Sequence, residues 1–592
     1  MRSLVIGPLC ELLPGSGDQE HVLLGPWCLC RNGHSPLDYR GHSCLPSPWG
    51  TLTALKEANR YVLDVTSRLV ESVARLANDL HGVNHSTRFW QLVLNGWPQE
   101  WLNLLLDIHT RLESTCSIGP LHARILPPTP IAFANYSHYA RLFTNHHVWA
   151  VVISDLLRHS RAFDWISIKE TLPMEPGLLE REMKTDSTPQ VSPTLRPWLR
   201  RLHRHLAART RCFFGHVYGI FPQHEVYLMT MADPMALFRR PVHNSRMRPE
   251  ISLPEGATLD FEPKNSFEEL IPALFPLHVP RKLYQYEEHA FRQKRIALGY
   301  HHYRAFDNEY YYAHMCEQGG KWISVQHGCS YGMDRFPEPN YEYGLLADEF
   351  ITWGWGSPED TPPCHPLPSP HLTYRRTAAP GDGSGILFMT TKLDSTYTHR
   401  LDRREYLIEH LPEALGKRKL FLQELGDSLR REVVFRPYAS TSPQYDELTP
   451  LKDAFPDLKI VSSAEEGFIQ ALDRSRLIVC DAPGTGLLMA MAMGVPCMAY
   501  IDPDRYAFTE AFRRTFDKLL AVEIVHTDPL SAARCIRRNH TAIGEWWNEP
   551  ERQRILDECC IQWARSDRTW YKQWRNFLWH RLKALDKASH RG

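Results

Sequence analysis

The sequence predicts an α/β protein of two domains, the second of which is a doubly wound parallel sheet. At 592 residues the chain is too long for one ordinary domain, and its apolar content of 43% is typical of globular proteins. In the second half, short apolar runs alternate with helical patterns, as parallel strands require. A Pro/Gly-rich stretch over 358–384 separates the two halves and is interpreted as a linker.

Residues 1–357 are expected to form an N-terminal α/β domain with large helical additions. Apolar residues recur at steps of three and four from Leu55 to Leu80, which predicts one long helix ending near Gly82. A second helical pattern continues to Leu112, although Gly96 and Pro98 should break or kink it. Strands are expected at 4–6, 22–24, 226–229, 322–325 and 350–352.

Residues 385–592 are expected to form a Rossmann-like domain with terminal helices. β-Branched and aromatic runs predict six strands, at 386–389, 433–435, 459–461, 477–479, 497–500 and 522–525. The end of the chain places Trp563, Trp570, Trp574 and Phe577 on one helical face. Such an aromatic stripe usually packs in a core or between domains, so the last helix is expected to pack back onto the protein.

Charge and cysteine content exclude several classes of function. Lys plus Arg and Asp plus Glu both number 68, so no overall basic field favours nucleic acid. The basic cluster from Arg196 to Arg211 is interpreted as a solvated helix face. The first apolar run is too short for a secretion signal, and the 14 cysteines are scattered. These features predict a cytoplasmic protein with reduced thiols.

Cysteines and histidines gather near the N-terminus, but no metal is expected there. Cys28, Cys30, His34, His42 and Cys44 lie close in sequence. Their spacing lacks the paired Cys-x-x-Cys knuckles of structural zinc sites.

The most informative stretch runs from Leu477 to Ile501. A β-branched strand ends at Asp481, and a Pro-Gly-Thr-Gly turn leads into an Ala/Met/Leu helix and a further strand. This unit places the N–H groups of a helix start beyond the carboxyl end of a buried strand, where α/β sheets bind phosphates. The predicted phosphate-binding residues are Pro483, Gly484, Thr485 and Gly486. The stretch has no charge from Ala482 to Ile501, but its glycines and prolines argue against a membrane span.

Other strand ends supply further candidates for the same site. Arg436 ends a strand expected beside the turn, and its guanidinium can bind a phosphate without a metal. A salt-bridge role for Arg436 remains an alternative. Thr391 and Lys392 follow the first strand of this half and form a second candidate phosphate loop. Asp481 is a candidate for contact with the nucleotide.

His327 is the candidate general base. It follows the strand expected at 322–325 in a Gln-His-Gly motif. A histidine at a strand end has a pKa of about 6.5 and can accept a proton from a hydroxyl near neutrality. Nearby tyrosines and Asp334 are candidates to orient the ring. Alternatively, His327 hydrogen-bonds only its loop or a phosphate.

A polar cluster between the two long helical patterns is the candidate acceptor site. His81, Asn84, His85 and Arg88 lie within eight residues and could bind a sugar. The alternative is that these residues end and begin helices, with Asn84 or Ser86 as an N-cap.

These motifs together resemble a bacterial family of transferases from surface-polysaccharide loci, distantly similar to capsule Kdo transferases and CDP-glycerol glycerophosphotransferases. The resemblance rests on residues 23–28, 81–90, 326–332, 353–355 and 481–500. It implies a GT-B-like fold with two Rossmann-like domains facing a cleft. In the glycerophosphotransferases a similar His-Gly motif serves as the base. There His-Pro usually stands where this chain has Arg436.

The resemblance also leaves one position unexplained. GT-B enzymes often carry a Glu early in this helix to hold the ribose hydroxyls, and Met489 stands near that place. Glu465 or Glu466, which open the preceding helix, could replace it. Alternatively, the two glutamates only favour the start of that helix electrostatically.

The sequence therefore predicts a metal-independent, cytoplasmic transferase that needs no cofactor. The resemblance implies a nucleotide-activated donor, with CMP- or CDP-linked donors favoured, and a glycan or lipid-linked acceptor. Neither nucleic acid nor a transmembrane span is expected, and membrane contact would be at most a peripheral association with the inner membrane. Two alternatives remain open, namely a non-phosphorylating nucleotide-sugar epimerase of the same fold and a catalytically silent scaffold in glycan assembly.

Overall fold

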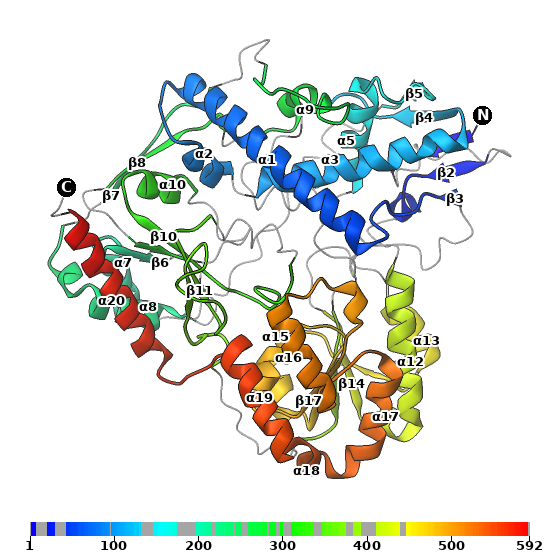
Figure 1. Cartoon of the computed structure of the whole chain (residues 1–592), viewed down its shortest axis with the longest axis vertical. Coiled ribbons are helices and arrows are strands. Elements are labelled where there is room, and N and C mark those ends of the chain that lie inside the picture. Colours follow the sequence, from blue (N-terminus) through cyan, green and yellow to red (C-terminus); the bar gives the residue numbers. More distant parts are fainter. Residues whose placement is uncertain are drawn as a thin grey trace.

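The computed structural model describes most of the chain, and its strands form three parallel sheets and one antiparallel pair within the described residues (Figure 1). Helices cover the sheets, so the protein has the expected α/β class. The described residues are 2–7, 20–29, 43–94, 96–129, 131, 146–173, 197–214, 217, 220–240, 243–251, 258–280, 283–291, 296–299, 309–335, 346–373, 383–391, 393, 410–438, 446–463 and 465–589.

The first sheet has the strand order β3-β2-β1-β4-β5 and is parallel throughout. Its helices α1, α3 and α5 pack on one another, and α5 also contacts β4. The bounds are β1 Arg2–Val5, β2 His21–Leu23, η1 Pro26–Leu29, β3 Ser43–Cys44, α1 Leu52–His81, α2 Thr87–Leu94, α3 Trp97–Ser114, η2 Thr115–Ile118, β4 Leu121–Ile125, α5 His146–His159 and β5 Ile166–Thr171.

Helix α1 is the long helix that the sequence predicts. Its N-cap Thr51 accepts a hydrogen bond from the N–H of Ala54, and Gly82 ends it in the left-handed conformation at φ 59°. The predicted break in the next helical pattern is also confirmed, because α2 ends at Leu94 and α3 begins at Trp97 with Pro98 in its first turn.

The second sheet has the order β12-β11-β10-β9-β6 and is also parallel. β7 and β8 pair antiparallel beside it. The bounds are α7 Pro197–Ala207, β6 Cys212–Phe214, α8 Pro222–Ala232, η3 Pro234–Leu237, β7 His243–Met247, α9 Leu270–Leu274, η4 Phe275–Leu277, β8 Glu287–Phe291, β9 Ile296–Leu298, α10 Glu309–Glu317, β10 Lys321–Val325, β11 Glu349–Thr352 and β12 Cys364–Pro366.

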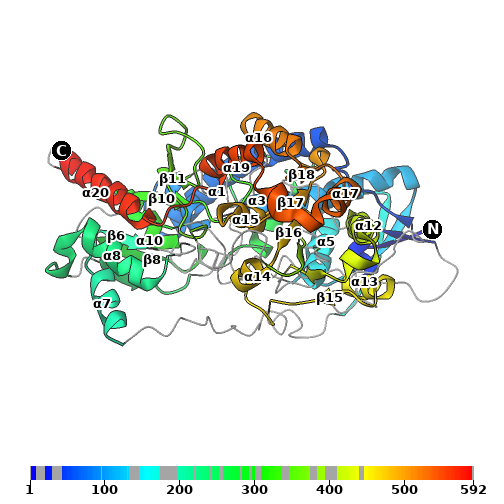
Figure 2. The same ribbon diagram turned by 90° about the horizontal axis from the view of Figure 1, so that it is seen from below.

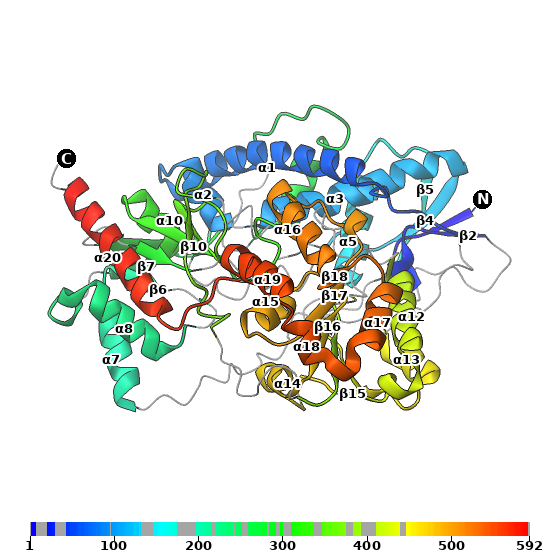
Figure 3. The same ribbon diagram turned by 60° about the horizontal axis from the view of Figure 1, so that its bottom comes forward.

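The third sheet has the order β15-β14-β13-β16-β17-β18, and every pair is parallel. Helices α12 and α17 pack together, whereas α15 and α16 pack on α19 (Figure 3). The bounds are β13 Ile386–Met389, α12 Leu411–Arg430, β14 Val433–Arg436, α13 Leu448–Ala454, β15 Lys459–Ile460, α14 Phe468–Arg474, β16 Leu477–Cys480, α15 Thr485–Ala492, β17 Cys497–Tyr500, η7 Pro503–Arg505, α16 Glu510–Ala521, β18 Val525–His526, α17 Pro529–Asn539, η8 His540–Ala542, α18 Ile543–Trp547, α19 Pro550–Trp563 and α20 Trp570–Ser589.

The C-terminal helix α20 packs back onto the second sheet, as expected from its aromatic stripe. It lies along α8 (Figure 2), and Trp570, Trp574 and Leu578 share one buried cluster with strand residues of that sheet. The last turn of α19 packs closely on the loop after β11, because a Cβ added to Gly354 would lie 2.2 Å from the carbonyl oxygen of Ile561.

Several expectations differ from the structure. The strand expected at 522–525 is wrong except at Val525, which begins β18. The expected linker 358–384 is wrong at 364–366, which form β12, and the next residues include the buried Ser369 and Leu372. The strand expected at 226–229 is part of helix α8, because its apolar residues pack on α7 at helical spacing.

The uncharged stretch from Ala482 to Ile501 forms a turn, the eight-residue helix α15 and strand β17, as predicted. Across the described residues, no helix is long and apolar enough to span a bilayer.

Candidate active site

The turn after β16 presents the start of helix α15. β16 is buried along its whole length, and Gly484 takes the N-cap position in an extended conformation. Within the described part of the chain, the N–H groups of Thr485 and Gly486 have no acceptor. Such N–H groups and the helix dipole favour an anion. A Cβ on Gly484 would have no neighbour closer than 3.9 Å, so packing does not explain the absence of a side chain there.

Thr485 connects this helix start to the second sheet. Its Oγ1 accepts a hydrogen bond of 3.1 Å from the N–H of Cys329, which follows the Gln-His-Gly motif. Gly328 packs against the same hydroxyl, which would lie 3.4 Å from an added Cβ. The predicted phosphate turn and the predicted catalytic loop are therefore in direct contact.

The loop from Gln326 to Arg335 is fixed on both sides. The buried Gln326 side chain accepts from the N–H of Trp353 and the indole N–H of Trp355, both at 2.8 Å, and donates to Gly328 O. On the other side, the Thr509 hydroxyl donates to Gly332 O at 2.8 Å while also capping α16. The Gln-His-Gly and Trp-Gly-Trp motifs thus form one structural unit.

His327 lies at the carboxyl end of β10, half-buried, with Nδ1 2.5 Å from the hydroxyl of Tyr331. When Nδ1 carries the proton and donates to Tyr331, Nε2 carries the lone pair that a general base uses. Tyr331 contacts the ring, and its role as the orienting partner of a base remains a prediction. Asp334 is buried and forms a backbone bridge with Phe508.

Arg436 lies at the end of β14 and is 7% exposed. Its Nη2 donates to Glu466 O at 2.9 Å, whereas its buried Nη1 has no partner among the described residues. Burial lowers the pKa of Arg436, with Glu466 opposing the shift. The Phe468 ring lies 6.0 Å from this guanidinium and within 3.5 Å of a Cβ placed on Gly486, so Arg436 is one phenyl ring away from α15.

A buried ion network that sequence analysis missed supports these loops. Arg418 of α12 is fully buried and pairs with Asp481 at 2.7 Å and with Glu447. Arg418 also donates to Thr391 O at 2.7 Å, and the N–H of Thr391 donates to Asp481 at 2.6 Å. Asp481 and Thr391 therefore hold the loops after β13 and β16 together.

Burial and ion pairing act in opposite directions on the pKa values of this network. Burial disfavours the charged guanidinium of Arg418, but the two carboxylates outweigh it and raise its pKa. Burial raises the pKa of Glu447, against the opposing attraction of Arg418. Because its partners lie 29 and 63 residues away, a sequence signal for Arg418 was not available.

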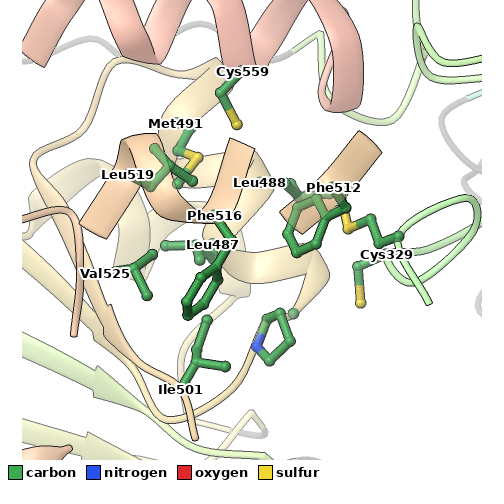
Figure 4. A pocket seen from close by; sticks show the side chains of 13 residues that line it. Cys329, Leu487, Leu488, Met491, Ile501, Phe512, Phe516, Leu519, Val525 and Cys559 are labelled. Atoms are coloured by element: carbon green, nitrogen blue, oxygen red, sulfur yellow. The ribbon is translucent and has the colours of Figure 1, made fainter. Parts of the chain in front are cut away.

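Two cavities adjoin the site. The first cavity lies between α15, α16 and Cys329, and apolar side chains line it (Figure 4). Its lining therefore offers no polar side chain to a nucleotide. The second is open, with a volume of about 540 Å³, and shares Thr391 and Asp481 with the network. Its charged side chains pair with one another, Lys417 with Asp502 at 3.0 Å and with Glu413 at 3.1 Å.

The candidates for ribose contact form local hydrogen bonds. Glu465 accepts from the N–H of Ser462 at 2.7 Å, and Glu466 pairs with Arg474 at 2.6 Å. Met489 is fully buried in the core, so its side chain offers nothing to a ligand. A ribose role for either glutamate remains a prediction.

The predicted acceptor cluster lies at a packed junction of the N-terminal region. His81 bonds Leu283 O at 2.7 Å, and His85 bonds the Tyr286 hydroxyl at 2.6 Å. Arg88 pairs with Asp348 at 3.2 Å, and Asn84 is exposed. Ser86 accepts from the N–H of Phe89, as the alternative capping role predicts. An acceptor role for these residues remains a prediction.

Lys392 lies outside the described residues. In the described part of the chain, no three His, Cys, Asp or Glu side chains gather closely enough to hold a metal ion.

Removing the Thr485 hydroxyl should loosen the junction. In Thr485→Val the N–H of Cys329 loses this acceptor, and a partly buried hydrogen bond of this kind contributes about 0.5–1.5 kcal/mol. We expect a lower free energy of unfolding and faster hydrogen exchange of the Cys329 amide. Thr485→Ser keeps the hydroxyl and serves as the control. Equal exchange in the two variants would contradict the contact.

Arg418→Met should destabilise the protein by about 3–5 kcal/mol, because Asp481 and Glu447 lose their buried partner. Burial raises the pKa of Glu447, so above its unfolded value the native state keeps a proton that the unfolded state loses, and stability falls as pH rises. Without Arg418 the pKa of Glu447 in the folded state rises further, so the pH range over which stability falls becomes wider.

Urea unfolding of Arg418→Met at several pH values checks this prediction. The destabilisation should shrink on acidification and when Glu447→Gln is added. A pH-independent loss would contradict it.

Three solved structures are similar to the chain at low identity. A variant of the wall teichoic acid polymerase TagF is 13% identical, with a TM-score of 0.32 over 66% of this chain and 95% of its own. MnaA of S. aureus with UDP is 8% identical, with a TM-score of 0.31 over 78% and 97%. MurG of Acinetobacter baumannii is 11% identical, with a TM-score of 0.27 over 48% and 72%. No curated protein matches the chain.

The family model for the LIC12162 family transferase matches residues 2–578. The second and third parallel sheets, with the helices that cover them, agree with the expected GT-B-like fold. Because the match covers nearly the whole sequence, the chain belongs to the LIC12162 family of transferases and is an enzyme of that class.

Proposed function

We propose that the protein transfers a sugar or a polyol-phosphate from a nucleotide-activated donor to a bacterial surface glycan. The observation that carries the proposal is the buried Nη1 of Arg436, which has no partner among the described residues, together with the unpaired N–H groups of α15, from which the Phe468 ring separates it. An unsatisfied buried guanidinium nitrogen costs about 1–3 kcal/mol or more, and an anion would remove that cost. A nucleotide phosphate fits both groups.

In this mechanism, the acceptor hydroxyl attacks the donor carbon or phosphorus while its proton passes to Nε2 of His327. The bond to the nucleotide phosphate breaks, and the electron pair leaves with that phosphate. Arg436 and the start of α15 stabilise the charge on the leaving group in place of a metal. The Tyr331 hydroxyl at Nδ1 stabilises the imidazolium that forms.

The Cys329–Thr485 hydrogen bond supports placing the two groups in one reaction. It connects the loop that carries His327 to the helix start that would hold the phosphate. Donor binding is therefore assigned to the third sheet, and the acceptor to the side of the second sheet. The sequence resemblance to CDP-glycerol and Kdo transferases favours a CMP- or CDP-linked donor, for a growing glycan or a lipid-linked acceptor.

Arg436→Met should weaken the binding of CDP by about tenfold to a hundredfold, the equivalent of one charge-assisted hydrogen bond. Thermal-shift titrations with CMP, CDP, UDP and GDP, followed by calorimetry, measure this loss. The matched control is Arg476→Met, which removes a partly exposed ion pair with Glu432. Unchanged CDP binding in Arg436→Met would overturn the donor site, and no binding of any nucleotide would favour a scaffold.

His327→Gln should lower turnover by about 10²–10⁴-fold while CDP binding stays unchanged. Tyr331→Phe should have a smaller effect and shift the pH–rate profile, because it removes only the orienting partner. Activity is measured as nucleotide release with acceptor glycan present and absent. Turnover of His327→Gln at the wild-type rate would contradict the base assignment, and epimerised sugar without acceptor would indicate an epimerase.

A further inference from the structure

Exposed apolar side chains that the proposed function does not use are carried by α7, α8 and η3, and α7 and α8 lie together at one end of the molecule (Figures 2 and 3). Six of the fourteen large apolar side chains that are exposed in the described residues fall between Trp198 and Phe238, so exposure is concentrated there. Phe238 is 81% exposed, Met235 61% and Trp198 59%. Aromatic and methionine side chains at such exposure are costly in water.

The same segment is strongly basic. Residues 197–240 contain seven arginines and only two acidic residues. Both acids have a side-chain partner within this segment, Asp233 with Arg239 at 2.7 Å and Glu225 with His203 at 2.5 Å. The exposed Arg200, Arg201, Arg204 and Arg240 have no acidic partner in the part of the chain that the structure describes.

The packing of α7 on η3 brings the two segments that carry these groups together. Leu202 and Leu206 pack inward on α8, whereas Trp198, Arg201 and His205 lie at steps of three and four on the neighbouring face of α7. His205 Nε2 lies 3.3 Å from Leu237 O, which joins this face to η3. The α7 corner therefore comprises Trp198, Arg201, Arg204, Met235, Leu237, Phe238 and Arg240.

We propose that the α7 corner binds the surface of an anionic lipid bilayer. Trp198, Met235 and Phe238 would enter the headgroup region, and the arginines would contact lipid phosphates. Charge complementarity favours an anionic lipid surface, because exposed arginines and exposed apolar side chains occur together in these neighbouring elements. This proposal goes beyond the transfer reaction and does not depend on it.

The test is co-sedimentation of the full chain with vesicles. Vesicles of phosphatidylglycerol and phosphatidylethanolamine should bind the protein, salt should weaken the binding, and phosphatidylcholine vesicles should bind far less. Each arginine near an anionic surface contributes about fivefold, so Arg201→Gln, Arg204→Gln and Arg240→Gln together should reduce the partition coefficient about a hundredfold. Met235→Ser with Phe238→Ser should reduce it about tenfold or more.

Matched controls lie on helices α12 and α16 beside the third sheet of the same chain. Leu420→Ser removes an exposed apolar side chain of α12, and Arg514→Gln removes an exposed cation of α16. Both should bind vesicles as the wild type does. Absent binding to anionic vesicles, equal binding to phosphatidylcholine, or wild-type binding by the corner variants would overturn the proposal. So would loss of self-association in the corner variants with vesicle binding unchanged, which would identify a protein interface.

Discussion

The hydrogen bond from the N–H of Cys329 to Oγ1 of Thr485 is the constraint on which the proposed site depends. It joins the carboxyl end of β10 to the start of α15, where two parallel sheets each present their functional edge. Each edge alone offers half of a site, since one carries His327 and the other carries the unpaired N–H groups of α15 and, across the Phe468 ring, Arg436. The side chains of Gln326 and Thr509 hold the connecting loop from its two sides through hydrogen bonds to backbone groups.

Arg418 plays the corresponding role beside the third sheet. Two carboxylates stabilise its buried charge. Burying these charged groups costs desolvation free energy, and their contacts hold the loops after β13 and β16 together. Asp481 is thereby committed to the loop after β13, and Arg436 is left as the buried cation whose Nη1 has no partner among the described residues. Arg418 has its hydrogen-bonding groups paired, whereas Arg436 has an unpaired one, and this difference is the reason that the proposed function assigns the phosphate to Arg436.

Local signals predicted much of the architecture. Hydrophobic periodicity located α1, and the Pro-Gly-Thr-Gly turn located α15 because both depend on neighbouring residues. The strand predicted at 226–229 was wrong because a short apolar run fits a strand or a helix equally. Packing on α7 favours the helix that the structure has there. β12 was missed because it is three residues long inside a proline-rich stretch and is defined only by pairing with β11. His327, Thr485 and Arg436 could be proposed from their places after predicted strands, and their roles remain predictions, whereas Arg418 and Glu447 depend on contacts distant in sequence.

Hydrogen exchange of the full chain with and without CDP tests most directly whether the two edges form one site. A site shared between the sheets predicts that CDP protects the amides of Thr485 and Gly486 and, at the same nucleotide concentration, those of Gly328 and Cys329. Protection of the α15 start with the loop after β10 unchanged would contradict a shared site and leave His327 without a role in the transfer.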